Sequence, residues 1–317
     1  MIRDHVRRLI LSKDRGLFIS EAYLESLIRT VFPPTEKQFI FPMSFWKDFP
    51  SYLQISASQA SALKNLALED ISICFSDYDL IDVPKSMAYF YVKGCIVSEL
   101  SRWDFSSRQF EHDIVKADEN PNIICHFLHI DSGGGDAYYL DRVAETLGKI
   151  SKPIYVLCDS VMCSAAYYIG CHGTKVCALT QNDVVGSIGT MISFWDTSGF
   201  FEEMGFKKIE AYSSHSDLKN KKTNDLINGK PDPFIKEVLD PYAEQFLAVI
   251  KAARPVLNDL PEDDPVFRGE TFSATIAKEK GLIDDIVTFS EAISEAYEMG
   301  INWEQSQPAR SKISSFM

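Results

Sequence analysis

Short apolar runs alternate with amphipathic stretches along the middle of the chain. Apolar runs of about four to eight residues suit buried strands, whereas apolar positions at three- and four-residue spacing suit helices. The runs that predict strands are 87–94, 123–131, 153–158, 175–179 and 207–213. The helical patterns among them cover 106–117, 136–150 and the residues after 164. This alternation predicts βαβ units with right-handed crossovers, and therefore an α/β fold.

The pattern changes towards both ends of the chain. Helical patterns cover 232–255, the residues before Gly281 and 290–300, and a glycine after a helix is typical of its C-terminal cap. Near the N-terminus, 20–32 has helical spacing and ends at two prolines. We expect three parts: an N-terminal accessory region at 1–86, a main domain at 87–290, and a C-terminal helix end with a polar tail at 291–317.

Composition narrows the class of protein. The chain has 317 residues, of which 45% are hydrophobic, so it can bury a sizeable core. Its formal net charge of −13 makes nucleic acid a poor partner. The seven cysteines suggest neither a disulfide framework nor a zinc site, and no window is apolar for long enough to span a membrane. We expect a cytoplasmic protein without a signal peptide, a metal or a cofactor.

Two turns of small residues carry the candidate chemistry. In "DSGGGD", residues 131–136, a predicted strand meets three glycines and then a helix, which exposes backbone N–H groups to a phosphate or an oxyanion. No phosphate-loop pattern accompanies the glycines, and a simple tight turn remains the alternative. In "CSAAYY", residues 163–168, Ser164 heads an apolar helix, where it either caps the helix or acts as a nucleophile.

His126 and His129 are a weaker candidate. Their odd separation on the strand 123–131 places them on opposite faces, so we expect core or edge histidines and not a ligand pair.

The two turns and "GSIGT" at 186–190 together resemble motifs of the signal peptide peptidase A (protease IV) family of serine peptidases. The segment 266–286 is similar to the closing segment of that family, so the resemblance covers about 87–286. It implies a Clp protease/crotonase-like spiral of strand-strand-helix units, with an N-terminal extension and C-terminal helices. It also implies a homo-oligomeric ring, in which some members complete their site between neighbouring protomers.

The resemblance further implies a catalytic Ser/Lys dyad. Ser164 would attack a peptide carbonyl, and Lys219 in "DLKN", 55 residues later, would take the proton. A lysine acts as a base only when neutral, so burial must lower its pKa by about three units. Lys221, Lys222 and His215 remain alternatives for the base.

Backbone N–H groups complete the implied site. Gly134 and Ala165 are the implied oxyanion donors, with Gly135 in support. Ser187 would orient the lysine amine, or is simply a turn serine. The chain departs from the family in two ways: alanines follow the nucleophile where the family has glycines, and Gly133 replaces a proline.

Three functions are compatible with these residues. The first is a serine endopeptidase that cleaves extended protein or peptide substrates at small or apolar residues. The second is an inactive assembly protein of the same fold, and the third is a crotonase-type acyl-CoA enzyme, which needs no nucleophile. The matched serine and lysine favour the first. The Lys-Asn pair at 219–220 resembles phage-type members, which implies a prohead or capsid maturation protease with capsid or scaffold proteins as partners.

Overall fold

The computed structural model describes residues 17–19, 53–55, 84–99, 101 and 104–307 of the chain. The helix predicted at 20–32 and most of the expected accessory region therefore lie outside the described residues.

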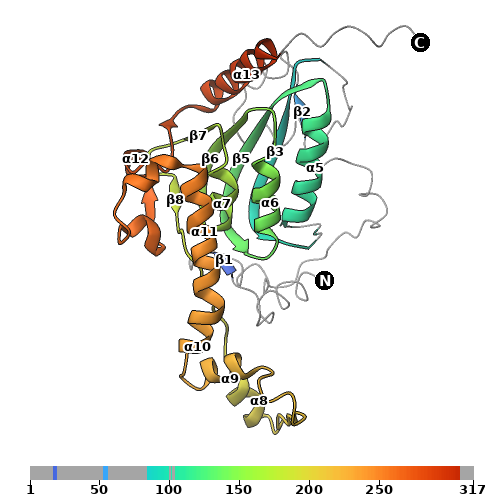
Figure 1. Ribbon diagram of the computed structural model, residues 1–317, viewed down its shortest axis with the longest axis vertical. Helices are drawn as coiled ribbons and strands as arrows, with labels where there is room; N and C mark the ends of the chain where they lie inside the picture. Colours follow the sequence, from blue (N-terminus) through green and yellow to red (C-terminus); the bar gives the residue numbers. More distant parts are fainter. Residues whose placement is uncertain (1–16, 20–52, 56–83, 100, 102–103, 308–317) are drawn as a thin grey trace, which may run out of the picture.

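A mostly parallel sheet forms the centre of the molecule (Figure 1). Its main path is β10 (Asp285–Ile286), β7 (Lys175–Ala178), β6 (Ile154–Cys163), β5 (Ile123–Asp136), β3 (Ser86–Val97) and β2 (Leu53–Ile55). The strands from β10 to β3 run parallel, whereas β2 is antiparallel at the edge. The two-residue strand β4 (Phe105–Ser106) pairs in parallel with the end of β3. The predicted α/β fold is confirmed.

Strand β6 leaves the main sheet halfway along its length. Residues 155–158 pair with β7, but 161–163 pair with β8 (Val184–Gly186), which in turn pairs antiparallel with β9 (Thr271–Ser273). Between the two halves Ser160 has a φ of +75°, and the register against β5 shifts after Ile130. This bend starts a second small layer of strands. It is the arrangement expected of the Clp protease/crotonase-like fold, and that fold class is confirmed.

Helices cover both faces of the sheet. The helices α5 (Ser107–Glu119), α6 (Leu140–Leu147) and α7 (Ala165–Gly170) pack on one face around the larger core, which includes Phe110 and Tyr168. On the other face, α13 (Phe289–Ser306) packs against Phe127 and Tyr155. The long strands are therefore buried on both sides, which is why their sequences read as continuous apolar runs.

The two histidines of β5 lie on opposite faces, as predicted. His126 bonds Asp118 at 3.0 Å beside α5, whereas His129 bonds Asp159 at 2.9 Å and Tyr89. Burial lowers the pKa of His126. Burial alone raises the pKa of Asp118, but hydrogen bonds from His126 and from the loop at 151–152 outweigh it and lower that pKa to about 2. Both histidines therefore serve the core.

A long helical segment follows residue 231. It consists of α10 (Asp232–Phe234), a π-helical stretch (Ile235–Leu239) and α11 (Asp240–Ala253), in agreement with the predicted helix at 232–255. Short 3-10 turns at Pro255–Asp259 and Pro265–Arg268 lead to β9 and α12 (Ala274–Glu279). Gly281 follows α12 with a φ of +82°, as expected of a C-terminal cap.

Residues 195–234, here called the arm, project from the sheet at the far end of α11 (Figure 1). The arm contains α8 (Ser198–Glu203), α9 (Lys221–Ile227) and α10. The strand predicted at 207–213 is wrong, because these residues are exposed and form no strand. Ile209, for example, is 83% exposed. An apolar run becomes a strand only where another strand offers it hydrogen bonds, and the arm offers none to this run.

No helix within the described ranges is both long and apolar enough to cross a membrane.

Candidate active site

Ser164 stands at the turn from β6 into α7 in a conformation that side-chain-bearing residues rarely adopt. Its φ and ψ are +55° and −120°. Its N–H donates to the Gly186 carbonyl at 2.9 Å, and its carbonyl accepts from the Tyr168 N–H at 2.8 Å. Backbone strain of this kind costs about 1–3 kcal/mol and is concentrated at functional sites. The surrounding strands and helix therefore hold Ser164 in a conformation it would not adopt alone.

The Ser164 side chain has no structural partner among the residues that the structure describes. It makes no capping bond to α7, so the helix-cap interpretation is wrong. Its Oγ is fully buried and has no hydrogen-bond partner among the described residues. A buried hydroxyl without a partner costs about 1–3 kcal/mol. A buried hydroxyl without a hydrogen-bond partner is expected of a reactive group whose partners are a substrate and a base.

The neighbouring Cys163 does not compete as a nucleophile. Burial raises the pKa of its thiol to about 12, so the thiolate is scarce at neutral pH. Its Sγ faces the Val184 carbonyl at 3.7 Å. Ser164 is left as the nucleophile candidate of this turn.

The three glycines of "DSGGGD" belong to β5 and do not form a turn. The helix predicted from residue 136 begins only at Leu140 because β5 continues to Asp136. Gly135 pairs with Ile96 of β3, and a Cβ at Gly135 would lie 2.0 Å from the Ile96 carbonyl oxygen. No residue but glycine fits this approach, which explains its place in the motif.

Gly134 and Ser164 both follow the last pair of residues between β5 and β6. Ser132 of β5 pairs with Met162 of β6, so Gly134 and Ser164 each lie two residues further along neighbouring strands. Gly134 has a φ of +103°, and its N–H donates to Ser132 Oγ at 3.1 Å. The structure thus brings the first and second motifs together.

The third motif joins them through β8. Gly186 pairs with Cys163, and the next residue, Ser187, is half-buried with a φ of +54°. The Ser187 N–H donates to the Glu270 carbonyl at 2.8 Å. The "GSIGT" segment therefore borders the Ser164 turn directly.

The candidate bases all lie on the arm. Lys219 and His215 are exposed, and one chain brings neither of them within hydrogen-bond distance of Ser164 Oγ. Within the described part of the chain, the Lys219 amine also has no ion-pair or hydrogen-bond partner. The apolar surroundings that a lysine base needs are therefore absent around Lys219 in the single chain.

Lys221 and Lys222 differ from Lys219 because each forms an ion pair. Lys221 Nζ lies 2.5 Å from Asp225, and Lys222 Nζ lies 2.6 Å from Glu237. A carboxylate partner stabilises the charged form of an amine, which opposes the role of a base. Of the three lysines, Lys219 is the one whose amine forms no ion pair with a described residue.

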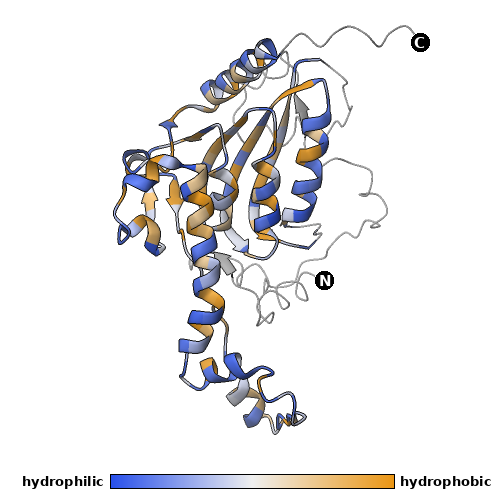
Figure 2. Ribbon diagram, viewed as in Figure 1, coloured by the Kyte–Doolittle hydropathy of each residue, from blue (hydrophilic) through white to orange (hydrophobic). Residues whose placement is uncertain are grey.

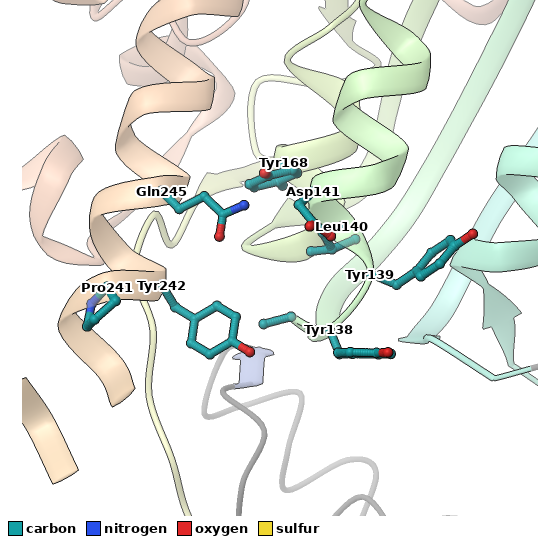
Figure 3. A pocket seen from close by; sticks show the side chains of 9 residues that line it. Tyr138, Tyr139, Leu140, Asp141, Tyr168, Pro241, Tyr242 and Gln245 are labelled. Carbon is teal, nitrogen blue, oxygen red and sulfur yellow. The ribbon is translucent and has the colours of Figure 1, made fainter. Parts of the chain in front are cut away.

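A pocket of about 340 Å³ lies beside the motifs and was missed from the sequence (Figure 3). It lies between the start of α6, the middle of α7 and the start of α11. Its lining residues are Ala137, Tyr138, Tyr139, Leu140, Asp141, Tyr168, Pro241, Tyr242 and Gln245. Tyr168 lies one helical turn after Ser164, and Ala137 follows β5 directly. The tyrosine pair of "CSAAYY" was the sequence signal that could have pointed to this pocket. The opposite wall comes from α11, which lies far from that pair in the sequence.

A strained, buried serine at a strand-to-helix turn is the geometry in which α/β hydrolases present a serine nucleophile, and Ser164 has this geometry. Residues 146–301 match the model of Peptidase family S49. This match agrees with the predicted resemblance to a family of peptidases. The comparisons bear on the family as a whole and not on its phage-type members.

Two curated relatives are similar to this chain. "Protease 4" of Haemophilus influenzae is 24% identical over 230 residues, which cover 69% of this chain and 35% of that protein. "Putative signal peptide peptidase SppA" of Enterococcus faecium is 25% identical over 202 residues, covering 61% of this chain and 56% of that protein. The chain thus spans between about a third and just over a half of the length of these relatives.

Among solved structures, a ClpP1 mutant from Listeria monocytogenes matches with a TM-score of 0.39 and 14% identity. The match covers 65% of this chain and 94% of that chain.

Proposed function

We propose that this chain is a serine endopeptidase with Ser164 as its nucleophile. The observation that carries the proposal is the buried Ser164 hydroxyl, which has no partner in the described part of the chain. It lies on a strained backbone inside the region that matches Peptidase family S49. Ser164 Oγ attacks the peptide carbonyl carbon and passes its proton to a base. The base returns the proton to the leaving amine, and water then hydrolyses the acyl-enzyme.

Two backbone N–H groups stabilise the oxyanion that forms during attack. Ala165 is the first residue of α7, where an N–H has no acceptor within the helix. The Gly134 N–H exchanges its 3.1 Å bond to Ser132 Oγ for the oxyanion. Each such donor contributes about 3–4 kcal/mol to transition-state stabilisation.

Lys219 is the proposed base, and a second copy of the chain brings it to Ser164. The arm that carries Lys219 exposes large apolar side chains, with Trp195 75%, Phe206 61% and Leu218 73% exposed. Figure 2 shows apolar and polar residues mixed along this projecting arm. An exposed apolar surface of this kind is typical of an interface. Assembly into a homo-oligomer buries the arm and removes water from the Lys219 amine, which favours the neutral form that a base needs.

The substrate is proposed to be an extended peptide with a small or apolar residue at the cleavage site. The pocket beside Ser164 is lined mainly by aromatic and aliphatic groups, which suit an apolar side chain. The Lys219-Asn220 pair supports a capsid-maturation role, with capsid or scaffold proteins as the natural substrates.

The test compares wild type with Ser164→Ala and Lys219→Ala, with Lys207→Ala as a control from the same arm. Casein cleavage and labelling by a serine-directed fluorophosphonate are measured from pH 6 to 10. We expect wild type and Lys207→Ala to cleave and label, with rates that rise through a lowered lysine pKa, and the other two to fail.

A mixture of Ser164→Ala and Lys219→Ala tests the shared dyad. If the dyad forms between copies, the mixture recovers activity, because some sites combine an intact serine with an intact lysine. Equal behaviour of all variants, while folded and assembled, would reject the peptidase and favour the inactive assembly protein.

A further inference from the structure

A short strand from the N-terminal part of the chain lies on the glycine strand of the site. The strand β1 (Leu17–Ile19) pairs antiparallel with the end of β5, where Leu17 is opposite Asp136 and Ile19 is opposite Gly134. It pairs with residues 134–136 of β5, which lie beyond the last residue of β5 that pairs with β6. Figure 1 shows β1 in blue at this end of the sheet. The chain therefore adds a strand to its own candidate active site.

The direction of β1 is that of a substrate. Its carboxyl-terminal residue, Ile19, lies opposite Gly134, the proposed oxyanion donor. A peptide bound this way presents the carbonyl of its last paired residue to the oxyanion donors and to Ser164. Main-chain pairing with a sheet edge is a common way to bind extended peptides.

The pocket adjoins the other end of β1. Leu17 is opposite Asp136, and Ala137, the next residue of the chain, lines the pocket. Figure 3 shows β1 as a pale blue arrow beside Tyr242 and Tyr138. The backbone of β1, the glycine end of β5 and the pocket thus follow one another in space.

We propose that Leu17–Ile19 is an internal substrate and that Ser164 cleaves the Ile19–Ser20 peptide bond of its own chain. This inference rests on the proposed function. Ser164 Oγ bonds to the Ile19 carbonyl carbon, and its proton passes through the base to the Ser20 nitrogen as the C–N bond breaks. Water then hydrolyses the ester, which leaves a carboxylate on Ile19 and restores the Ser164 hydroxyl. Release of residues 1–19 frees the edge of β5 and the neighbouring pocket for other peptides.

Intact mass and N-terminal sequencing of the full chain test this inference. We expect wild type to lose residues 1–19 with time and Ser164→Ala to stay intact. Ser164→Ala should also stay intact when mixed with wild type, because β1 pairs within its own chain. Phe18→Pro should slow the cleavage about three- to tenfold, because a proline ring is poorly accommodated inside a paired strand and weakens the pairing of β1 with β5.

Gln54→Pro is the matched control. Gln54 is the central residue of β2, which pairs with β3 at the other edge of the sheet, so its self-cleavage should match wild type. Ile19→Asp is a second variant, because a carboxylate beside the reacting carbonyl opposes the developing negative charge. Circular dichroism confirms that each variant is folded.

Parallel fluorophosphonate labelling and casein cleavage separate the possible failures. Wild type that labels and cleaves casein but keeps its N-terminus overturns this inference and leaves the proposed function standing. A cut at another bond, a cut of Ser164→Ala in the mixture, or equal rates for Phe18→Pro, Ile19→Asp and wild type also overturns it. Wild type that neither labels nor cleaves casein removes the proposed function, and this inference with it.

Discussion

Ser164→Ala should make the isolated chain more stable while it removes the proposed nucleophile. In the structure the Ser164 hydroxyl is fully buried and has no partner among the described residues. Folding therefore takes this hydroxyl out of water without a compensating hydrogen bond. Replacing it by a hydrogen atom leaves the backbone and the Cβ as they are and removes only that cost.

The expected gain follows from the cost of an unsatisfied buried hydroxyl, about 1–3 kcal/mol. In a domain of this size, 1 kcal/mol changes the melting temperature by about 2–4 °C, so the expected rise is roughly 2–12 °C. Ser164→Gly should be at least as stable, because it also relieves the strained φ of +55°. The relief is about 1–3 kcal/mol, less about 0.5–1 kcal/mol for the added freedom of glycine in the unfolded chain.

The assay is thermal and urea unfolding at a dilution where the chain is monomeric. The matched control is Ser98→Ala. Ser98 is also buried, but its Oγ donates to Asp136 at 2.6 Å, so its removal should destabilise the chain by about 1–3 kcal/mol. If Ser164→Ala melts at or below the wild-type temperature, the Ser164 hydroxyl has a structural partner and the reasoning from its isolation is refuted.

Three further changes test other parts of the structure. Gly135→Ala should destabilise the chain by about 3 kcal/mol and abolish casein cleavage, because its methyl group meets the backbone of β3. Gly189→Ala is the control: the nearest atom to its methyl group would be 3.6 Å away, so it should melt like wild type. Arg254→Lys should cost about 1.5–3 kcal/mol in urea unfolding, since lysine cannot keep both bonds to Asp284, at 2.8 and 3.1 Å; an unchanged midpoint would contradict this. The lowered pKa of His126 means that the folded state binds fewer protons, so the melting temperature should fall as the pH drops below about 6.5, and less so in His126→Gln.

The α/β fold could be predicted because its signals are local. The apolar runs that became β3, β5, β6 and β7 are buried on both faces, and the helices between them show apolar positions on one side. The same reasoning failed at 207–213, where an apolar run lies on the exposed arm without a neighbouring strand. It also failed at 136–139, because the glycines continue β5 by pairing with a distant strand.

The candidate site was only partly predictable. The sequence identified Ser164 and the glycine motif, since small residues at the end of a strand are visible in one stretch of chain. It left Lys219 among several bases, and the structure places all of them on the arm. The pocket escaped prediction because its walls come from segments about a hundred residues apart, at 137–141 and 241–245.

The sequence by itself determined the alternation of strands and helices, and the placement of small residues and one serine at the ends of two strands. These follow from periodicity and from residue size, which act within a few positions of the chain. Only the tertiary structure decided that the Ser164 hydroxyl is left without a partner, that the glycines pair with β3 and β1, and that the arm stands away from the sheet. Hydrogen-bond partners, close backbone approaches and exposure depend on which distant segments meet, and no local pattern encodes that.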